Sequence, residues 1–390
     1  MTPSPWPASC VPAEGPAGRP LLLAAGVSVR QLAQAAAREG FSLVALDAFG
    51  DADTRAAACR WQRWRDFDAA TLLAALDEAA RAGACGWIAA SGFEAHPDLL
   101  EAAAQRLPLL GTPPAAWRRL RDPRRFFPLL DALGLPHPPT RWGEAPTDLQ
   151  GWLLKDGGAC GGRHVQPARG AAATRRALPY WQRRMAGTPM AAAFVADGRR
   201  ARLLGVHEQL VGLAQAPFAW RGAVGPLTMP PKVSTHIDTA LQQLVPACGL
   251  RGLGSLDFLL GADGTIALLE VNPRPGGTLQ LYAAQSPLGL HLRACSGVPW
   301  AVQPVPQVVC GVETVFAPRT LHLGPHALRR LARRPWVHDR PGQACSLQAM
   351  EPLCSLNAQG ATAAEVRAQL QRRHAELLEL LEAESHEHME

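Results

Sequence analysis

The sequence lacks any run of apolar residues that approaches the roughly 20 needed for a membrane-spanning helix. Its first apolar stretch, Leu21–Val27, is too short for that and is preceded by a single basic residue, Arg19, so we interpret it as a buried strand. The nine cysteines are dispersed and form no Cys-x-x-Cys pair, which argues against a zinc ribbon and a disulfide framework. These absences predict a cytoplasmic protein with no membrane partner.

Lysine is almost absent as well. Of the 39 basic residues only Lys155 and Lys232 are lysines, and all the others are arginines. Lysine is a compact point charge and arginine a planar fork, so a retained lysine is a candidate for a place that arginine cannot fill. The arginines are mixed with alanine, leucine and proline, as at 117–125, without the aromatic stacking platforms of a nucleic-acid surface. We therefore expect solvated helix faces and no nucleic-acid partner.

The order of the predicted elements indicates a parallel α/β domain near the N-terminus. Strands are expected at 21–25, 41–46 and 86–90, with helices at 30–40 and 69–82 between them. The first strand is followed by Gly-Val-Ser-Val-Arg, which is not the Gly-x-Gly-x-x-Gly fingerprint of a dinucleotide site. A dinucleotide cofactor is therefore disfavoured.

A predicted β-hairpin over residues 253–272 carries the most informative polar residues. Asp263-Gly264 is a strong signal for a two-residue turn between alternating apolar strands. With that turn, Asp257 lies opposite Glu270, and Asn272 lies opposite Ser255. Because side chains alternate between the faces of a strand, the two acids and the asparagine project from the same side.

Two directly opposed carboxylates repel each other and need compensation. A hard cation with oxygen ligands, Mg²⁺ or Mn²⁺, would provide it. The alternative is a solvent-exposed acidic face on an edge hairpin. A metal site also accounts for Asn272, so we predict Asp257, Glu270 and Asn272 as metal ligands.

A glycine-rich segment follows a predicted strand at 153–155. Its glycines would let backbone N–H groups approach an anion closely: Gly157, Gly158, Gly161 and Gly162. Lys155 can place its ammonium group on phosphate oxygens, although it precedes the glycines, unlike the lysine of a Walker A loop. Alone, the segment could be a flexible turn. Together with the carboxylate hairpin it predicts an ATP site.

The segment Asn272–Thr278, Asn-Pro-Arg-Pro-Gly-Gly-Thr, leaves the hairpin and should turn at its prolines. Arg274 would then lie beside metal-bound phosphates, where it could stabilise a transferring phosphoryl group. Gly276, Gly277 and Thr278 could donate further N–H groups to an acceptor carboxylate. An arginine with a purely structural role in this corner is the alternative.

These residues, in this order, resemble the ATP-grasp superfamily over roughly residues 20–300. The resemblance is strongest at 155–165 and 257–278. The segments 46–53, 336–341 and 352–355 are similar to an uncharacterised branch that occurs in archaea and methylotrophs using tetrahydromethanopterin-type C1 cofactors.

The resemblance implies an α/β plus α+β ATP-grasp fold with a Rossmann-like N-terminal lobe. We expect a disordered Pro-rich tail at 1–19, an N-terminal domain at 20–111, an ATP-grasp domain at 112–300 with a small lobe at about 140–190, and a small C-terminal domain at 301–390. The last of these should end in an amphipathic helix at 363–384 with Val366, Leu370, Leu377 and Leu381 on one face.

The resemblance also implies roles for individual residues. Lys155 and Arg274 would be catalytic, and the hairpin residues would hold Mg²⁺ or Mn²⁺. The nucleotide would contact Lys155, the four glycines and an adenine hinge near Tyr180–Met185, with these members: Gln182, Arg184 and Met185. The sequence departs from the family at Asp122-Pro123, where Asp-Lys is usual, and at Asp156, where a proline is usual. No ribose-binding acid is evident at 187–191, so the choice between ATP and GTP stays open.

The expected activity is that of a carboxylate–amine ligase, which activates a small-molecule carboxylate as an acyl phosphate with ATP and transfers it to an amine. Alternatives are a kinase built on the same site and a non-catalytic nucleotide-binding protein. The acceptor pocket should involve the N-terminal lobe, His207, Gln209 and residues 278–282, and the resemblance also allows a homodimer.

Overall fold

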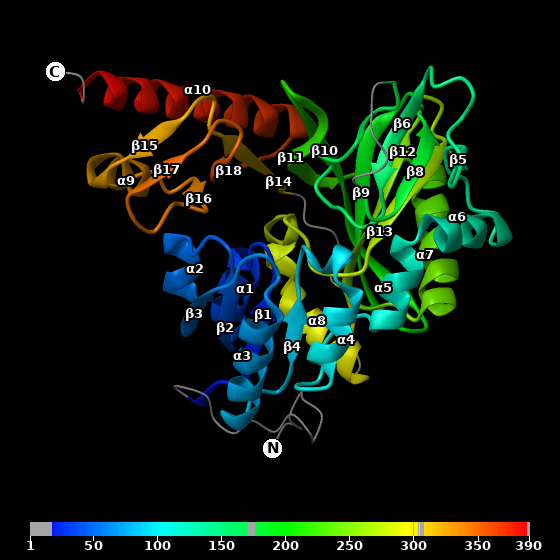
Figure 1. The fold of residues 1–390 in the computed structure, drawn as a ribbon, viewed down its shortest axis with the longest axis horizontal. Helices are drawn as coiled ribbons and strands as arrows, with labels where there is room; N and C mark the ends of the chain where they lie inside the picture. Colours follow the sequence, from blue (N-terminus) through cyan, green and yellow to red (C-terminus); the bar gives the residue numbers. More distant parts are fainter. Residues whose placement is uncertain (1–17, 170–175, 299, 303, 305–307, 388–390) are drawn as a thin grey trace.

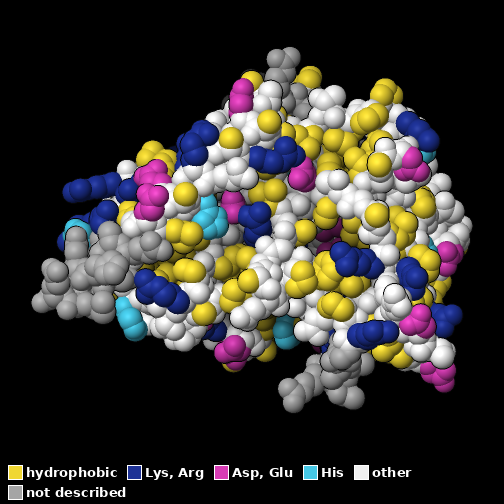
Figure 2. All heavy atoms as spheres, turned by 90° about the horizontal axis from the view of Figure 1, so that it is seen from above, with side chains coloured by type: hydrophobic (Ala, Val, Ile, Leu, Met, Phe, Trp, Pro, Cys, Tyr) yellow, Lys and Arg dark blue, Asp and Glu magenta, His cyan; other side chains and the backbone are white. Residues whose placement is uncertain are grey.

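The computed structural model describes residues 18–169, 176–298, 300–302, 304 and 308–387. Almost all of the tail predicted at 1–19 lies outside this part of the chain. Within the described ranges, no helix has the length and apolar composition that crossing a membrane requires. On the face shown in Figure 2, basic, acidic and apolar side chains are intermixed rather than gathered by type.

The N-terminal part forms the predicted parallel α/β domain, drawn in blue and cyan in Figure 1. Its strands are β1 (Leu21–Ala25), β2 (Ser42–Asp47), β3 (Arg60–Arg63) and β4 (Trp87–Ala89). Its helices are α1 (Arg30–Glu39), α2 (Ala52–Ala57), α3 (Ala69–Arg81), η3 (Phe93–Ala95) and α4 (Pro97–Ala104). The sheet has the order β3-β2-β1-β4 with parallel pairing, and β1 is buried along its whole length, as expected for a strand covered on both faces.

Two helices lead into a small antiparallel sheet. The helices are α5 (Pro114–Arg121) and α6 (Pro123–Ala132), and the strands are β5 (Thr140–Arg141), β6 (Trp152–Asp156), β7 (Gln166–Pro167) and β8 (Pro179–Arg183). The sheet has the order β5-β8-β6-β7. Helix α6 starts at Pro123 because Asp122 caps it, accepting a hydrogen bond from the backbone N of Arg124 (2.9 Å). The glycine-rich segment connects β6 to β7.

A long antiparallel sheet joins the centre of the chain to its C-terminal part. Its strands are β9 (Thr188–Asp197), β10 (Ala201–Leu213), β11 (Ala216–Leu227), β12 (Arg251–Leu260), β13 (Ile266–Asn272), β14 (Val309–Phe316), β16 (Val337–His338) and β18 (Pro352–Gly360). Their order is β13-β12-β9-β10-β11-β14-β18-β16. Because β14 pairs with β11, the sheet runs across residue 300, where we had placed the start of a separate domain.

The remaining elements cover this sheet or lie beyond its end. They are α7 (Pro231–Cys248), η5 (Leu279–Gln285), α8 (Pro287–Ser296), β15 (Leu321–Leu323), α9 (Pro325–Ala332), β17 (Cys345–Leu347) and α10 (Ala363–Glu387). Figure 1 shows α10 lying along the C-terminal strands. The four apolar residues predicted for one face of this helix are all buried, at 0–4% exposure. The helix therefore packs through that face.

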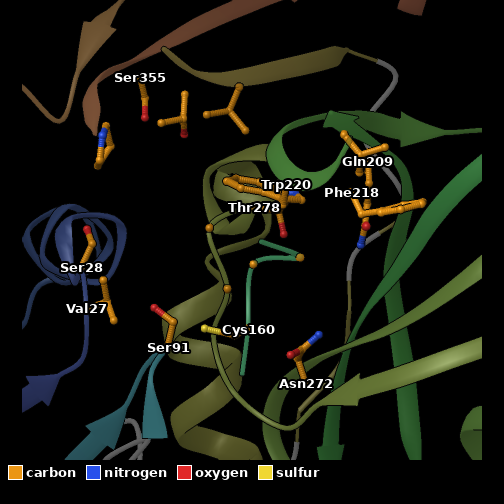
Figure 3. A pocket seen from close by; sticks show the side chains of 18 of the residues that line it. Val27, Ser28, Ser91, Cys160, Gln209, Phe218, Trp220, Asn272, Thr278 and Ser355 are labelled. Carbon is orange, nitrogen blue, oxygen red and sulfur yellow. The ribbon is translucent and has the colours of Figure 1, made fainter. Parts of the chain in front are cut away.

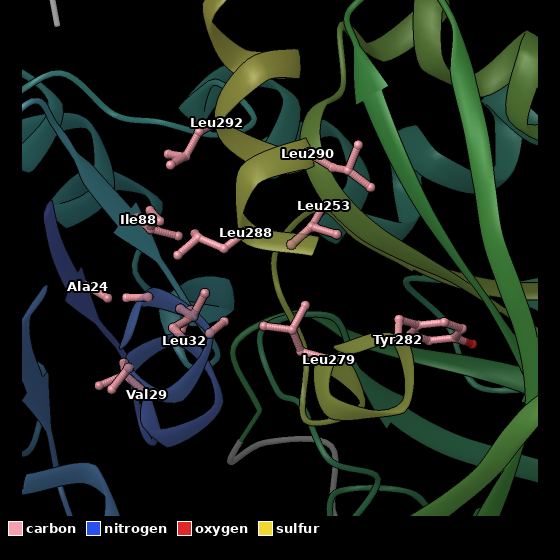
Figure 4. Packing of buried hydrophobic residues seen from close by; sticks show 14 of the residues in the cluster. Ala24, Val29, Leu32, Ile88, Leu253, Leu279, Tyr282, Leu288, Leu290 and Leu292 are labelled. Carbon is pink, nitrogen blue, oxygen red and sulfur yellow. The ribbon is translucent and has the colours of Figure 1, made fainter. Parts of the chain in front are cut away.

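The two faces of the long sheet pack against different layers. One face meets α5, α6 and α7 around residues such as Phe194 and Phe258. The other meets α8 and the N-terminal domain, where Leu253 and Leu288 contact a cluster that includes Ile88 (Figure 4). Leu253 belongs to this second face, and the alternate residues that follow it on β12 line a cleft instead. The polar residues of the hairpin are therefore placed where the apolar packing ends.

The hairpin has the predicted pairing but not the predicted turn. Asp257 pairs with Glu270 and Ser255 with Asn272, whereas nearer the turn Leu260 pairs with Ile266, one residue out of that register. The loop is longer than the two residues we predicted, because the backbone N of Gly261 donates to Thr265 O (2.8 Å) and Gly264 adopts a φ of 78°. A β-bulge between Asp257 and Phe258 restores the register. Without it, Glu270 would point into the core.

Candidate functional site

One large cleft, with a volume of about 1060 Å³, is lined by all three parts of the chain. Figure 3 shows Ser28 and Ser91 on the N-terminal wall, Gln209 and Asn272 on the long sheet, and Ser355 on the C-terminal strand β18. The cleft is open to solvent on one side and reaches the polar face of the hairpin. It is large enough for a nucleotide and a second small molecule.

The three residues predicted as metal ligands converge on this cleft. The Nδ2 atom of Asn272 donates to Asp257 Oδ2 (3.3 Å) and to Glu270 Oε1 (3.4 Å), and Ser255 Oγ donates to Asp257 Oδ1 (3.1 Å). The two acids are partly exposed to the cleft, and Asn272 is 8% exposed. The predicted common face is therefore confirmed.

A metal ion is not the only cation that can offset the repulsion between the two carboxylates, contrary to what we had inferred from the sequence. Arg121, the last residue of α5, is 5% exposed, and its NH1 lies 3.0 Å from Glu270 Oε2. Arg121 also donates through Nε to Gly157 O (2.8 Å). Burial raises the pKa of Glu270, but Arg121 and Lys155 outweigh burial and hold it below its usual value. Sequence reasoning missed Arg121, because it lies within a run of arginines that we assigned to solvated helix faces.

Asp257 has no such partner. Burial, reinforced by the charge of Glu270, raises the pKa of Asp257 to about 7. Among the described residues, no three Asp, Glu, His or Cys side chains are arranged to hold a metal ion by themselves. Magnesium commonly takes one or two protein carboxylates and completes its shell with substrate phosphates and water. Two carboxylates, an amide and one uncompensated charge fit that kind of site.

Lys155 lies at the end of β6, as predicted, and lines the same cleft. Its Nζ donates to Gln182 Oε1 (2.7 Å), and Gln182 donates in turn to Thr140 Oγ1 (3.1 Å). Burial lowers the pKa of Lys155 to about 8, although Glu270 and Asp257 act in the opposite direction. Gln182 on β8 and the two residues after this strand, Arg184 and Met185, also line the cleft where we predicted the adenine hinge.

The glycine-rich segment is divided in two. Gly161 and Gly162 line the cleft, whereas Gly157 is placed against Arg121: a Cβ there would lie 2.2 Å from the Arg121 carbonyl oxygen. Gly157 also donates its N–H to Leu178 O (2.9 Å), so we correct our explanation of this glycine from anion approach to close backbone packing. Gly158 is likewise absent from the residues that line the cleft, and its N–H donates to Asp156 Oδ1 (2.9 Å).

Asp156 explains one departure from the family pattern. Its carboxylate accepts hydrogen bonds from the backbone N–H groups of Gly158 (2.9 Å), Ala177 (3.1 Å) and Leu178 (3.0 Å). These bonds join the start of the glycine-rich segment to the residues that lead into β8. An aspartate after Lys155 therefore shapes the loop through its carboxylate. Proline has no side-chain acceptor and could not make these bonds.

The far half of the segment is closed against β11. Trp220 donates its backbone N–H to Gly161 O (2.9 Å), and a Cβ on Gly162 would lie 2.0 Å from Phe218 O. Both glycines have a φ of 73°, but a Cβ on Gly161 would meet nothing within 4 Å. A side chain at either position would meet the same strain of a left-handed backbone. The two positions differ in the space that a side chain would have.

This pair gives a matched test of the closed loop. We expect Gly161→Ala to cost only the strain of a left-handed residue, about 1–2 kcal/mol. For the ATP site predicted from the sequence, Gly162→Ala should in addition push the segment off β11 and raise the KM for ATP by about tenfold more than Gly161→Ala does. Steady-state kinetics of both variants over a range of ATP concentrations measure the difference. Equal KM values would show that contact with β11 does not matter for the nucleotide.

Arg274 is paired across the molecule. Its Nε donates to Glu94 Oε1 (2.7 Å), and the two side chains are 9% and 1% exposed. Burial raises the pKa of Glu94, but Arg274 and Arg121 outweigh burial and hold it below its usual value. Glu94 belongs to η3 of the N-terminal domain, and no sequence pattern we used singled it out. It holds the guanidinium of Arg274 at the cleft beside Asn272.

His207 lines the cleft, and its ring contacts Tyr282. The ring Nδ1 lies 2.7 Å from the hydroxyl of Tyr282, and the histidine is 1% exposed. Burial lowers the pKa of His207 to about 3, so the ring is neutral at physiological pH. The geometry therefore favours a structural role for His207 over a place among the acceptor-binding residues.

Comparison with known proteins gives both a domain and a fold. The family model described as "ATP-grasp domain" matches residues 121–278. Biotin carboxylase from Campylobacter jejuni, solved as a β-γ-ATP complex, is 14% identical and superposes with a TM-score of 0.68 over 90% of this chain and 89% of that chain. N5-carboxyaminoimidazole synthetase from Staphylococcus aureus, complexed with ADP, is 13% identical and superposes with a TM-score of 0.68 over 92% of this chain and 97% of that chain. The biotin carboxylase domain of a single-chain bacterial carboxylase is 20% identical and superposes with a TM-score of 0.64 over 92% of this chain and 88% of that chain.

Proposed function

Because the chain has the ATP-grasp fold, with an ATP-grasp domain at residues 121–278, we propose that it is an ATP-dependent carboxylate–amine ligase. One observation carries the proposal: Lys155, Arg274 and the hairpin residues Asp257, Glu270 and Asn272 line a single cleft. They come from three separate segments. The lysine and the arginine suit a polyphosphate, and the two carboxylates suit its metal ion. The wall formed by the N-terminal domain leaves room beside them for other substrates.

In this proposal the hairpin residues hold Mg²⁺ or Mn²⁺ together with the nucleotide phosphates. The ion supplies positive charge that neutralises the β- and γ-phosphate oxygens. Lys155 binds phosphate oxygens from the small sheet, and Gln182, Arg184 and Met185 contact the base. Gly161 and Gly162 offer backbone N–H groups over the phosphates.

The chain's own residues then act on the substrates. A carboxylate oxygen attacks the γ-phosphorus, ADP leaves, and an acyl phosphate forms. An amine attacks the acyl carbon, the acyl C–O bond breaks, and phosphate leaves with one oxygen of the original carboxylate and the proton lost by the nitrogen. Arg274, held in place by Glu94, stabilises the charge that develops on the transferring phosphoryl group and on the tetrahedral intermediate.

Acyl phosphates hydrolyse, so the reaction needs a cleft that excludes water. The segment around Gly161 and Gly162 is already closed on Phe218 and Trp220 of β11. Arg163, next in the chain, donates to the carbonyl oxygen of Met350 and packs over the ring of Phe316. The closed loop is therefore held from the C-terminal side of the cleft as well.

The experiment that tests the proposal is a screen of carboxylate and amine pairs for ADP release, with free phosphate measured in parallel. A ligase releases ADP and phosphate in equal amounts and only when both substrates are present. A kinase would release ADP without free phosphate, and a nucleotide-binding protein would release neither. For a pair that turns over, carboxylate labelled with ¹⁸O should transfer one labelled oxygen to the phosphate. Phosphate that carries no ¹⁸O would overturn the acyl phosphate route.

A further inference from the structure

The N-terminal wall of the cleft, to which we assign no nucleotide contact, contains a buried acid without a hydrogen-bond partner. Asp51 follows β2 and precedes α2, is 6% exposed, and lines the cleft. It occupies the cap position of α2 but accepts no capping hydrogen bond, and it makes no side-chain hydrogen bond to any described residue. A buried carboxyl without a partner lowers stability, so its presence at a cavity wall points to a ligand.

The acids around Asp51 are all satisfied. Asp47 accepts hydrogen bonds from Trp61 Nε1 (2.8 Å) and the backbone N of Gly50 (2.9 Å). Asp53 accepts from the backbone N–H groups of Asp339 (2.9 Å) and Arg340 (3.2 Å), across the contact between the N-terminal domain and the C-terminal part. Asp51 also lines the cleft, but it has no such donor.

The acids outnumber the arginine that pairs with them. Arg30 is 1% exposed, and its Nε lies 2.5 Å from Asp339 and 3.8 Å from Asp53, so its single charge already serves two carboxylates. Burial, together with the charges of Asp339, Asp47 and Asp53, raises the pKa of Asp51 to about 8. A cation bound at Asp51 would relieve this repulsion.

An organic cation suits this position better than a metal ion. Three acids of this cluster already use oxygens on donors within the protein, so Asp51 would be a metal ion's single carboxylate ligand. Two further basic residues line the same cleft nearby in the chain, Arg63 and Arg65, and both are exposed. They suit an anionic group on the same ligand. We propose that Asp51 binds the ammonium group of the amine substrate, which also carries a carboxylate or phosphate.

This inference rests on the proposed ligase function, because it assigns the acceptor end of the same cleft. The two ends are connected through α1. Gln31 donates through Nε2 to Gly277 O (2.6 Å) and accepts from the backbone N of Gln280 (3.0 Å), while Arg30 NH1 donates to Gln280 Oε1 (3.1 Å). The segment that carries Arg274 is therefore fastened to the helix whose first residue pairs with the acids around Asp51.

The test compares wild type with Asp51→Asn and Asp51→Ala by thermal shift in the presence of Mg-ATP. The probes are glutamate and phosphoethanolamine, with propylamine lacking the anion and N-acetylglutamate lacking the ammonium group. We expect glutamate or phosphoethanolamine to raise the Tm of wild type, and which of the two does so distinguishes carboxylate from phosphate. Both variants should bind that compound about tenfold more weakly, the loss expected for one charge-assisted hydrogen bond.

Two further readouts keep the outcomes apart. Without amine, Asp51→Asn should have a Tm equal to or above that of wild type, because it removes a buried carboxyl that has no partner. Asp98→Asn is the control, since Asp98 is 93% exposed in the same domain, and it should leave amine binding unchanged. If no amine shifts wild type, or if Asp51→Asn keeps the shift, the inference is overturned. If wild type fails to bind Mg-ATP at all, the proposed function fails instead.

Discussion

Glu270→Gln is expected to lower ADP release by about 100-fold or more, the loss typical when one group that stabilises transition-state charge is removed. Glutamine keeps the shape of the side chain and can still accept the hydrogen bond from Arg121, so the fold should stay intact. The negative charge that would hold the metal ion and its phosphates is lost. Turnover is measured with a substrate pair found by the screen, at saturating ATP and Mg²⁺, and circular dichroism checks the fold.

Glu144→Gln is the matched control for this variant. Glu144 is an exposed glutamate between β5 and β6, outside the residues that line the cleft, and its neutralisation should leave turnover unchanged. Wild-type turnover in Glu270→Gln would remove the metal assignment and with it the reason for placing the phosphates at the hairpin.

Arg274→Ala should both abolish turnover and destabilise the protein. The change leaves Glu94 charged, 1% exposed and without its arginine, and breaking a buried ion pair by removing one partner costs about 3–5 kcal/mol. The double variant Arg274→Ala with Glu94→Ala should recover most of that stability, because no buried charge is left unpaired. It should not recover turnover, since the guanidinium at the cleft is still missing. Urea unfolding and ADP release, measured on all three variants, separate the two effects.

The stability of Arg274→Ala should also depend on pH. In wild type the pKa of Glu94 lies below its usual value, so its ion pair contributes stability at neutral pH and loses it as the pH falls through the folded-state pKa. In Arg274→Ala, burial without that arginine should raise the pKa of Glu94. The gap in unfolding free energy from wild type should therefore be largest near pH 7 and smaller near about pH 4, where glutamate begins to protonate in the unfolded chain. A gap that does not change with pH would mean that Glu94 does not sense Arg274.

The hairpin shows how far sequence patterns reach. Alternation placed Asp257, Glu270 and Asn272 on one face, and the structure agrees. The turn that we used to set the register was wrong, because the loop is longer than Asp263-Gly264 alone. A β-bulge corrects the offset, and nothing local in the sequence announces that bulge. The predicted pairing is correct because the bulge cancels the offset of the turn, which keeps the apolar residues of both strands in the core.

The counterions were not predictable in the same way. Arg121 reaches Glu270 across 149 positions of sequence, and Glu94 reaches Arg274 across 180. Each pair depends on how segments far apart in the chain pack together, which periodicity and spacing within one segment do not encode. For the same reason the sequence did not reveal that β14 extends the long sheet into the C-terminal part, or that Asp51 would be left without a partner. The expectations of a homodimer and of a cytoplasmic location stay predictions.

The most direct test of the central claim is a calorimetric titration of the wild-type protein with ATP, performed once with Mg²⁺ and once with a chelator. Our account predicts that ATP binds and that Mg²⁺ strengthens the binding, because Asp257, Glu270 and Asn272 share the ion with the phosphates. No heat of binding, or an affinity that is the same with and without the metal, would contradict it.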